Sequence, residues 1–339
     1  MYNQVLHDHL DGGLRPSTAK ELAKHINYEP INKIDDVASF FDRSSSTSLE
    51  EYLEAFTHTI ALMQTYSNLE QIAYEAAMDM HQNNIHFYES RYAPFYSVNE
   101  DLSPLDVIKA INSGFKEAEN ECGIISGLIL CGMRHDPDNV KAVAELAIEH
   151  KNLIIGFDIA GPELNFLPSM YKDSFLKVKN AGINITIHAG EGDGVNSIQE
   201  AIDNGAKRIG HGVRIIEDIS DNNKLGHTAD YVLQNNIPLE ICISSNIHTN
   251  MYKSPQEHPI SRLHDLGFNI SLNDVPEQGS YTAGAASTIT YNTSSLTASG
   301  GISKINLTSG GFGYKNVPGV SSVTSANGTG ENILCLSSN

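Results

Sequence analysis

The sequence predicts an α/β fold, a (β/α)8 TIM barrel, with a doubly wound open sheet as the rival architecture. Eight short apolar runs alternate with segments of helical periodicity. Nearly every run carries its unusual polar side chains at its carboxyl end. A chain of 339 residues with 40% hydrophobic content can also bury a large core. Together these observations define the predicted fold class.

Short apolar runs are the candidate strands. In chain order they occupy residues 4–10, 85–92, 124–135, 153–161, 183–191, 207–212, 237–245 and 268–274. Segments between them, such as 69–83 and 137–152, place apolar residues three and four positions apart and therefore predict amphipathic helices.

The ends of these runs distinguish a barrel from an open sheet. They carry His7, His9, Glu89, Arg91, Arg134, His135, Asp158, His188, His211, Ser244, Ser245 and Asp274. In an open sheet, strands at opposite edges are too far apart to share one site. A barrel brings all its strand ends to one face, so the polar residues favour the barrel.

Charge and composition exclude several kinds of partner. The net charge of −19 argues against duplex nucleic acid and anionic membrane, which favour clusters of Lys and Arg. The N-terminal stretch MYNQVLHDHL has no export signature, and no run of 18 apolar residues occurs. We therefore expect a cytoplasmic protein with a small-molecule ligand. Cys122, Cys131, Cys242 and Cys335 form no CxxC pair, which favours buried thiols.

Composition changes after the eighth run, so we divide the chain into a barrel at 1–274 and a tail at 275–339. The tail contains no His, Asp or Arg, and its only cations are Lys304 and Lys315. Its Gly, Ser and Thr residues separate alternating segments, which is typical of β-hairpins or low-complexity sequence. No segment of helical period follows the eighth run, so we expect the barrel to lack its usual closing helix.

Histidines supply the candidate chemistry. His7 and His9 are two residues apart, so on a strand they share a face and can share a metal ion. They can equally be ordinary polar residues at a strand end. His188 is followed by Glu191 in a Gly-rich turn, where one residue can bind metal and the other move protons. His211 lies between two glycines, which let a ligand approach the backbone closely.

Several motifs in order carry a resemblance to a known family. LHDHLDGGLRPST, GMRHDP, GFDIAGPE, TIHAGEGDG, RIGHGVRI and LEICISSN occur in sequence between about residues 3 and 274. In these motifs the chain resembles the adenosine deaminase family of the amidohydrolase superfamily. The resemblance implies a barrel that binds one zinc ion through His7, His9, His188 and an aspartate at the end of the eighth strand, here Asp274.

The resemblance also implies a reaction, the hydrolytic deamination of adenosine or 2′-deoxyadenosine to inosine or 2′-deoxyinosine and ammonia. Zinc makes hydroxide available near neutral pH by lowering the pKa of a bound water. Attack at purine C6 then requires a proton on N1. By resemblance, Glu191 supplies this proton and His211 orients or deprotonates the water.

Substrate contacts are implied for His9, Asp11 and Gly161, with Asp11 holding a ribose hydroxyl and the Gly161 N–H meeting a purine nitrogen. From the residues alone, Asp11 can also cap a helix and Gly161 can simply turn the chain. Leu53 and Phe56 lie three apart where the family has an apolar helix over the purine, or they are ordinary core residues.

Three residues at strand ends have two interpretations. Arg91, Arg134 and His135 can orient metal ligands, or they can simply pair with carboxylates inside the barrel.

The eighth strand departs from the family pattern. The family has Ser-Leu/Ile-Asn-Thr-Asp, whereas this chain has Ser271-Leu272-Asn273-Asp274-Val275. Without a gap, Val275 takes the ligand position, and with one residue deleted Asp274 does. A shift of one residue turns the side chains to the opposite face of a strand, so the two alignments imply different sites.

Two other functions fit the same residues. One is deamination of another 6-aminopurine, such as adenine. The other is a non-catalytic purine-binding or structural protein that assembles through residues 275–339. The sequence gives no indication of the oligomeric state.

Overall fold

A computed structural model describes residues 4–42, 46, 48–273, 290–291 and 305–306. Asp274 and most of the tail predicted at 275–339 therefore lie outside the described residues. Two short tail strands are described, β9 (Thr290–Tyr291) and β10 (Ile305–Asn306), and they pair in antiparallel fashion. The division of the chain at residue 274 stays a prediction.

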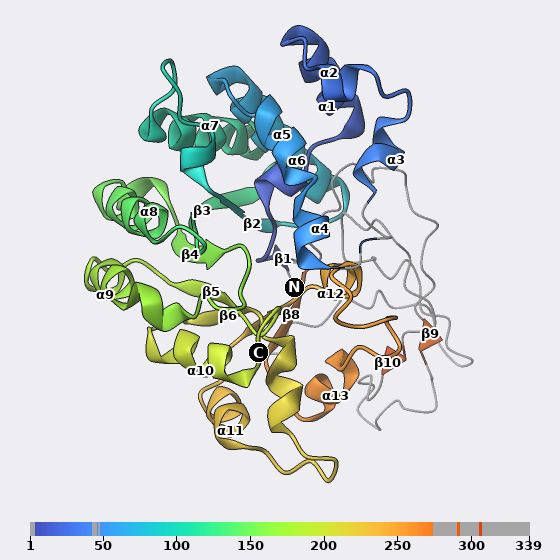
Figure 1. Cartoon of the computed structure of the whole chain (residues 1–339), viewed down its shortest axis with the longest axis vertical. Helices are drawn as coiled ribbons and strands as arrows, with labels where there is room; N and C mark the ends of the chain where they lie inside the picture. Colours follow the sequence, from blue (N-terminus) through green and yellow to red (C-terminus); the bar gives the residue numbers. More distant parts are fainter. Residues whose placement is uncertain (1–3, 43–45, 47, 274–289, 292–304, 307–339) are drawn as a thin grey trace.

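Eight parallel strands follow the predicted order around a curved sheet (Figure 1). They are β1 (Gln4–Val5), β2 (Phe87–Tyr92), β3 (Ile125–Met133), β4 (Gly156–Ala160), β5 (Thr186–Ala189), β6 (Arg208–His211), β7 (Leu239–Ile241) and β8 (Ile270–Leu272). A parallel bridge between Phe157 and Ile185 connects β4 to β5. The predicted α/β barrel architecture is confirmed.

Helices connect and surround the strands. In chain order they are α1 (Pro16–His25), α2 (Glu29–Asn32), α3 (Val37–Phe41), α4 (Leu49–Leu53), α5 (Phe56–Leu62), α6 (Tyr66–Gln82), α7 (Pro104–Cys122), α8 (Pro137–Glu149), α9 (Lys172–Asn180), α10 (Val195–Asp203), α11 (His227–Gln234), α12 (Ile243–His248) and α13 (Ile260–Asp265). Short 3-10 helices are η1 (Leu10–Gly12), η2 (Pro94–Tyr96), η3 (Lys151–Leu153), η4 (Pro168–Tyr171) and η5 (Val213–Asp218). Among the described residues, no helix is both long enough and apolar enough to cross a membrane.

Local sequence signals set the limits of the longest helix, α7. Ser103 and Asp106 form a reciprocal capping box at its start, where backbone N–H groups have no partner within the helix. At its end Gly123 adopts φ 80°, a left-handed conformation that glycine enters without a steric penalty.

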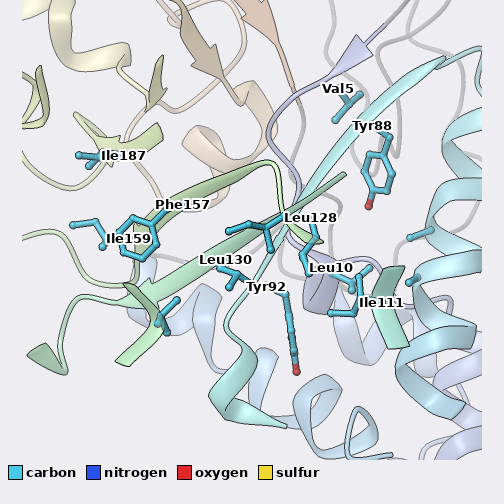
Figure 2. Packing of buried hydrophobic residues seen from close by; sticks show 14 of the residues in the cluster. Val5, Leu10, Tyr88, Tyr92, Ile111, Leu128, Leu130, Phe157, Ile159 and Ile187 are labelled. Carbon is cyan, nitrogen blue, oxygen red and sulfur yellow. The ribbon is translucent and has the colours of Figure 1, made fainter. Parts of the chain in front are cut away.

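Successive side chains of each strand divide between the helices and the barrel interior. Apolar residues face the helices, as the Tyr88–Phe115 and Phe157–Phe175 ring contacts show at centroid distances of 5.7 and 5.8 Å. Figure 2 shows part of this outer core. Other side chains of the same strands are charged, among them the fully buried Arg91 of β2 and Asp158 of β4. The interior is therefore a polar network rather than layers of branched apolar residues.

Asn273 connects the last strand to the first. Its Oδ1 accepts a hydrogen bond of 2.7 Å from the backbone N–H of Leu6, and its own N–H donates to Ile241 O at 2.7 Å. No ladder between β8 and β1 occurs among the described residues. This side chain therefore helps hold the segment that carries His7 and His9 against the end of the barrel.

Two local predictions were wrong in detail. Ser244 and Ser245 were expected at a strand end, but β7 stops at Ile241 and both serines belong to α12. Leu53 and Phe56 were expected on one helix, but α4 ends at the first and α5 begins at the second. Cys242 alone separates β7 from α12, and Glu54 and Ala55 separate α4 from α5 while keeping helical dihedrals, so periodicity over a few residues does not reveal either boundary.

We expect Asn273→Ala to lower the free energy of unfolding by about 1–3 kcal/mol, because it leaves the Leu6 N–H without its acceptor. Chemical denaturation measures this change. Asn269→Ala is the control, because among the described residues the Asn269 side-chain amide makes a single exposed contact of 3.5 Å, and it should change stability by less than about 0.5 kcal/mol. Equal effects of the two substitutions would contradict the closing role of Asn273.

Candidate active site

Three histidines converge at the carboxyl ends of β1 and β5. His7 and His9 follow β1, and His188 lies in β5. Each offers one ligand nitrogen, and these nitrogens all lie within 4.8 Å of one another. His9 Nε2 and His188 Nε2 are 3.1 Å apart. The predicted metal-binding histidines are thus brought together, whereas Asp274 lies outside the described residues.

The residue between the first two histidines anchors them. Asp8 is fully buried, and its Oδ2 accepts hydrogen bonds from the Tyr88 hydroxyl and, at 2.8 Å, from the Ser90 hydroxyl. Alternate residues of an extended segment point to opposite faces. Holding Asp8 against β2 therefore directs His7 and His9 together toward His188.

Buried carboxylates orient two of the histidine rings. Glu240 Oε2 lies 2.9 Å from His7 Nδ1, and Asp158 Oδ2 lies 2.8 Å from His188 Nδ1. These contacts direct both Nε2 atoms inward. His7 Nε2 is buried and has no hydrogen-bond partner among the described residues. Carboxylate-oriented imidazoles with inward nitrogens are the donor set of a metal centre, so the residues fit a metal ion.

A second group of possible ligand atoms comes from His7, His211 and Cys242. It shares His7 with the first group. Among the described residues, the first group brings two Nε2 atoms, those of His9 and His188, within 3.1 Å of each other, and carboxylates lie behind the rings of His7 and His188. His7, His9 and His188 are therefore the stronger candidate for a metal centre.

Arg91 connects the two orienting carboxylates. Its guanidinium donates to Asp158 Oδ2 at 2.7 Å, to Glu240 Oε2 at 3.0 Å and to the carbonyl of Leu6 at 2.9 Å. Both predicted interpretations of Arg91 are thus combined: it pairs with barrel carboxylates, and those carboxylates orient the histidines.

Burial keeps the histidine cluster neutral. It lowers the pKa of His7 and His188 well below the usual range, and the nearby Arg91 charge lowers both further. The pKa of His9 is also lowered well below the usual range, first by burial and then by His188. Neutral imidazole is the form that binds a metal ion, so the site favours ligation without first removing a proton.

Glu191 lies in the Gly-rich turn after β5, and Glu163 shapes that turn. The Glu163 carboxylate accepts backbone hydrogen bonds of 2.7–3.0 Å from all four residues 190–193. Burial, and then the charge of Glu163, raises the pKa of Glu191 to about 8. Glu191 therefore carries a proton at neutral pH and can act as a general acid.

His211 occupies a strained backbone conformation at the end of β6. Its φ is 60°, a region that non-glycine residues rarely enter, and such strain is often found at functional sites. Its ring lies 4.8 Å from the His7 ring between centroids, and its Nε2 lies 3.5 Å from Glu191 Oε1. Glu191 and His211 thus face the cluster together.

The glycine before His211 has a different purpose from the one expected. A Cβ at Gly210 would lie 3.0 Å from His7 Cε1 and 3.2 Å from His188 Cα. The space that glycine provides is therefore used by the metal-binding histidines themselves, rather than by a ligand approaching the backbone.

The predicted substrate residues lie in separate segments at the barrel mouth. Asp11 is buried in η1, and burial raises its pKa to about 7. Gly161 follows β4 with φ 94°, and a Cβ there would lie 3.2 Å from Met133 Cε. The Phe56 ring stands perpendicular to that of His9 at a centroid distance of 6.4 Å. Phe56 therefore borders the cluster.

Arg134 supports the site through the backbone rather than through a ligand ring. Its fully buried guanidinium donates to the carbonyl of His188 and, at 3.3 Å, to that of Ile159. This pair of contacts holds the ends of β4 and β5 together. Among the described residues His135 makes no comparable hydrogen bond, and its Nδ1 lies 3.3 Å from the position of a Cβ at Gly161.

Polar strand ends around a histidine cluster, with carboxylates behind the rings, define a metal-dependent hydrolase of the barrel type. A family model described as adenosine deaminase matches residues 3–292. Adenosine deaminase 1 of Streptomyces coelicolor is 42% identical over 283 residues, covering 79% of this chain and 71% of the relative. The chain belongs to the adenosine deaminase family, whose members hydrolyse a C–N bond.

Another relative agrees with this assignment, and two solved structures share the fold. The adenosine deaminase of Mycobacterium avium is 39% identical over 287 residues, covering 79% of this chain and 78% of the relative. An adenine deaminase from Arthrobacter aurescens superposes with a TM-score of 0.74 at 21% identity, covering 81% of this chain and 83% of that one. A Burkholderia ambifaria amidohydrolase with bound Zn superposes with a TM-score of 0.68 at 22% identity, covering 81% of this chain and 75% of that one. The two structures show the shared fold.

We expect Glu240→Gln to weaken metal binding by about 10–100-fold, because the carboxylate that orients the His7 ring is lost. Competition with a chromophoric chelator measures the affinity. Glu89→Gln is the matched control, because Glu89 contacts Arg208 at the other end of the same network and contacts no histidine among the described residues. Unchanged metal affinity in Glu240→Gln would contradict the orienting role.

Proposed function

We propose that this chain catalyses the zinc-dependent hydrolytic deamination of adenosine and 2′-deoxyadenosine, producing inosine or 2′-deoxyinosine and ammonia. The observation that carries the proposal is the position of a proton-bearing Glu191 and of His211 beside the neutral histidine cluster. Curated relatives at 39% and 42% identity are named adenosine deaminases, which supports the choice of substrate.

Each residue has a stated role in the proposal. Glu191 donates its proton to the purine ring nitrogen N1, and His211 positions the attacking water. Asp11 holds a sugar hydroxyl, the Gly161 N–H meets a ring nitrogen, and His9 borders the substrate as well as binding metal. His7, His9, His188 and Asp274 hold one zinc ion, which when bound supplies an activated water and stabilises negative charge.

The organisation of the chain belongs to the same proposal. Residues 1–274 form the deaminase barrel, and residues 275–339 are a separate tail. A cytoplasmic location and a purine nucleoside as the small-molecule partner complete it.

The direct test is whether the purified, zinc-loaded chain converts adenosine to inosine. The loss of absorbance that accompanies deamination measures this conversion. Asp11→Ala should lower kcat/KM for adenosine much more than for adenine, because only the nucleoside carries a sugar hydroxyl for Asp11. Folded, zinc-loaded protein that leaves adenosine and 2′-deoxyadenosine unchanged would refute the proposal. Turnover of adenine with no loss in Asp11→Ala would instead favour a deaminase of a free 6-aminopurine.

The rate should also depend on pH through Glu191. The active form of a general acid is protonated, so activity is present below its pKa and is lost as the pH rises through it. With the pKa of Glu191 raised to about 8, kcat/KM should fall tenfold per pH unit on the alkaline side. Glu191→Gln should lower kcat by about 10²–10⁴-fold and remove this alkaline limb. An unchanged limb in the variant would assign the titration to another group.

A further inference from the structure

A chain of buried polar groups leads away from the active site behind His211. Asn246 in α12 lies 3.1 Å from His211 Nδ1 through its Nδ2. On its other side, Asn246 Oδ1 lies 3.2 Å from His258 Nε2. His258 stands just before α13, and the backbone N–H of Ile260 donates to His258 Nδ1 at 3.2 Å. Asn246 and His258 are 0% and 5% exposed, so water does not compete for these contacts.

We call the series His211, Asn246, His258 and the Ile260 N–H the relay. The backbone N–H at its end fixes the direction of each of its hydrogen bonds. An amide N–H can only donate, so His258 Nδ1 must accept from Ile260 and cannot carry a proton. The proton of a neutral His258 is therefore on Nε2, and the Asn246 atom facing it must be the carbonyl oxygen. The remaining amide group of Asn246 is the NH₂, which donates to His211 Nδ1. Burial lowers the pKa of His258 to about 4, in agreement with a single ring proton.

We infer that His258 is a positioning residue, which acts through Asn246 to hold His211 in the tautomer that carries its proton on Nε2. This inference rests on the proposed function for its catalytic meaning. The Nε2 atom is the one that lies 3.5 Å from Glu191 Oε1, toward the reaction centre. His211 then orients the water by donating a hydrogen bond. It does not take the proton of the water, because its Nδ1 already accepts from Asn246 and its Nε2 is already protonated.

Surrounding groups hold the relay in place. The backbone carbonyl of Asn246 accepts from the backbone N–H groups of Met251 and Tyr252 at 3.0 and 3.1 Å, which fixes the end of α12. The Tyr252 ring packs on His258 at a centroid distance of 4.9 Å. No charged side chain contacts His258 among the described residues. The tautomer therefore depends on hydrogen-bond direction alone.

Two substitutions at position 258 separate the relay from simple packing. In His258→Gln the side-chain NH₂ takes the place of Nε2 and can still donate to Asn246. In His258→Asn the shorter side chain can still accept from Ile260 but no longer reaches Asn246. Thermal unfolding and zinc content measure whether each variant folds and holds metal. His264→Asn is the control, because His264 lies on the exposed side of α13.

The expected kinetic result is a loss of kcat by about 10–100-fold in His258→Asn with KM changed less than threefold, and a kcat within about threefold of wild type in His258→Gln. A packing role predicts instead that the shorter and the longer side chain reduce kcat equally, or that loss of kcat follows loss of folded protein. Either result would overturn the inference.

The tautomer itself is measurable without activity. Protein labelled with ¹⁵N-histidine should show a protonated Nε2 and an unprotonated Nδ1 for His211, whose signals are identified by their absence in His211→Gln. Asn246→Asp places an acceptor opposite Nδ1 and should move the proton there. A proton on Nδ1 in the wild-type zinc-loaded chain would overturn the inference. Wild-type protein with the expected tautomer but without adenosine turnover would refute the proposed function and leave the relay supported.

Discussion

The ion pairs of Arg91 are the interaction on which the site depends. A buried guanidinium is costly without partners, and here it has carboxylates from β4 and β7 together with a backbone carbonyl after β1. The same carboxylates hold the Nδ1 atoms of His7 and His188. One cation thus fixes the spacing of three strands, and the positions of the candidate ligand nitrogens follow from that spacing. Arg208 extends the network by joining Glu240 to Glu89.

The strands and the histidine cluster could be predicted from the sequence, but the side chains that orient the histidine rings could not. Apolar runs with polar ends predicted all eight strands, because alternate side chains of a strand must divide between helices and barrel interior. The spacing of His7 and His9 predicted a shared face for the same reason. Glu240 could not be found in this way, since it lies 233 residues from His7, within a run that reads as an ordinary buried strand. Glu163 gave one local signal, an acid directly after the Gly-Pro turn that follows β4.

Two polar networks of different chemistry meet at the site. Carboxylates, held in turn by arginines, support His7 and His188, where negative charge behind the imidazole rings favours the binding of a cation. An amide, a neutral imidazole and a backbone N–H support His211, where the direction of a hydrogen bond matters more than charge. His258 could not be found from the sequence, because its sequence neighbours give no sign that it contacts Asn246 behind His211. Glu191 lies beside His211, and its own burial, followed by the charge of Glu163, raises its pKa.

The polar interior of the barrel has a consequence for how the chain folds. Arg91 and Asp158 are 67 residues apart, and Arg91 and Glu240 are 149 apart, so neither pair can form until distant strands have docked. Until then water stabilises each charge better than a half-built barrel does. Partly assembled sheets therefore gain little from collapsing around these groups. Closure of the ring should be a late and strongly cooperative step, with slow folding as the outcome of so many non-local contacts.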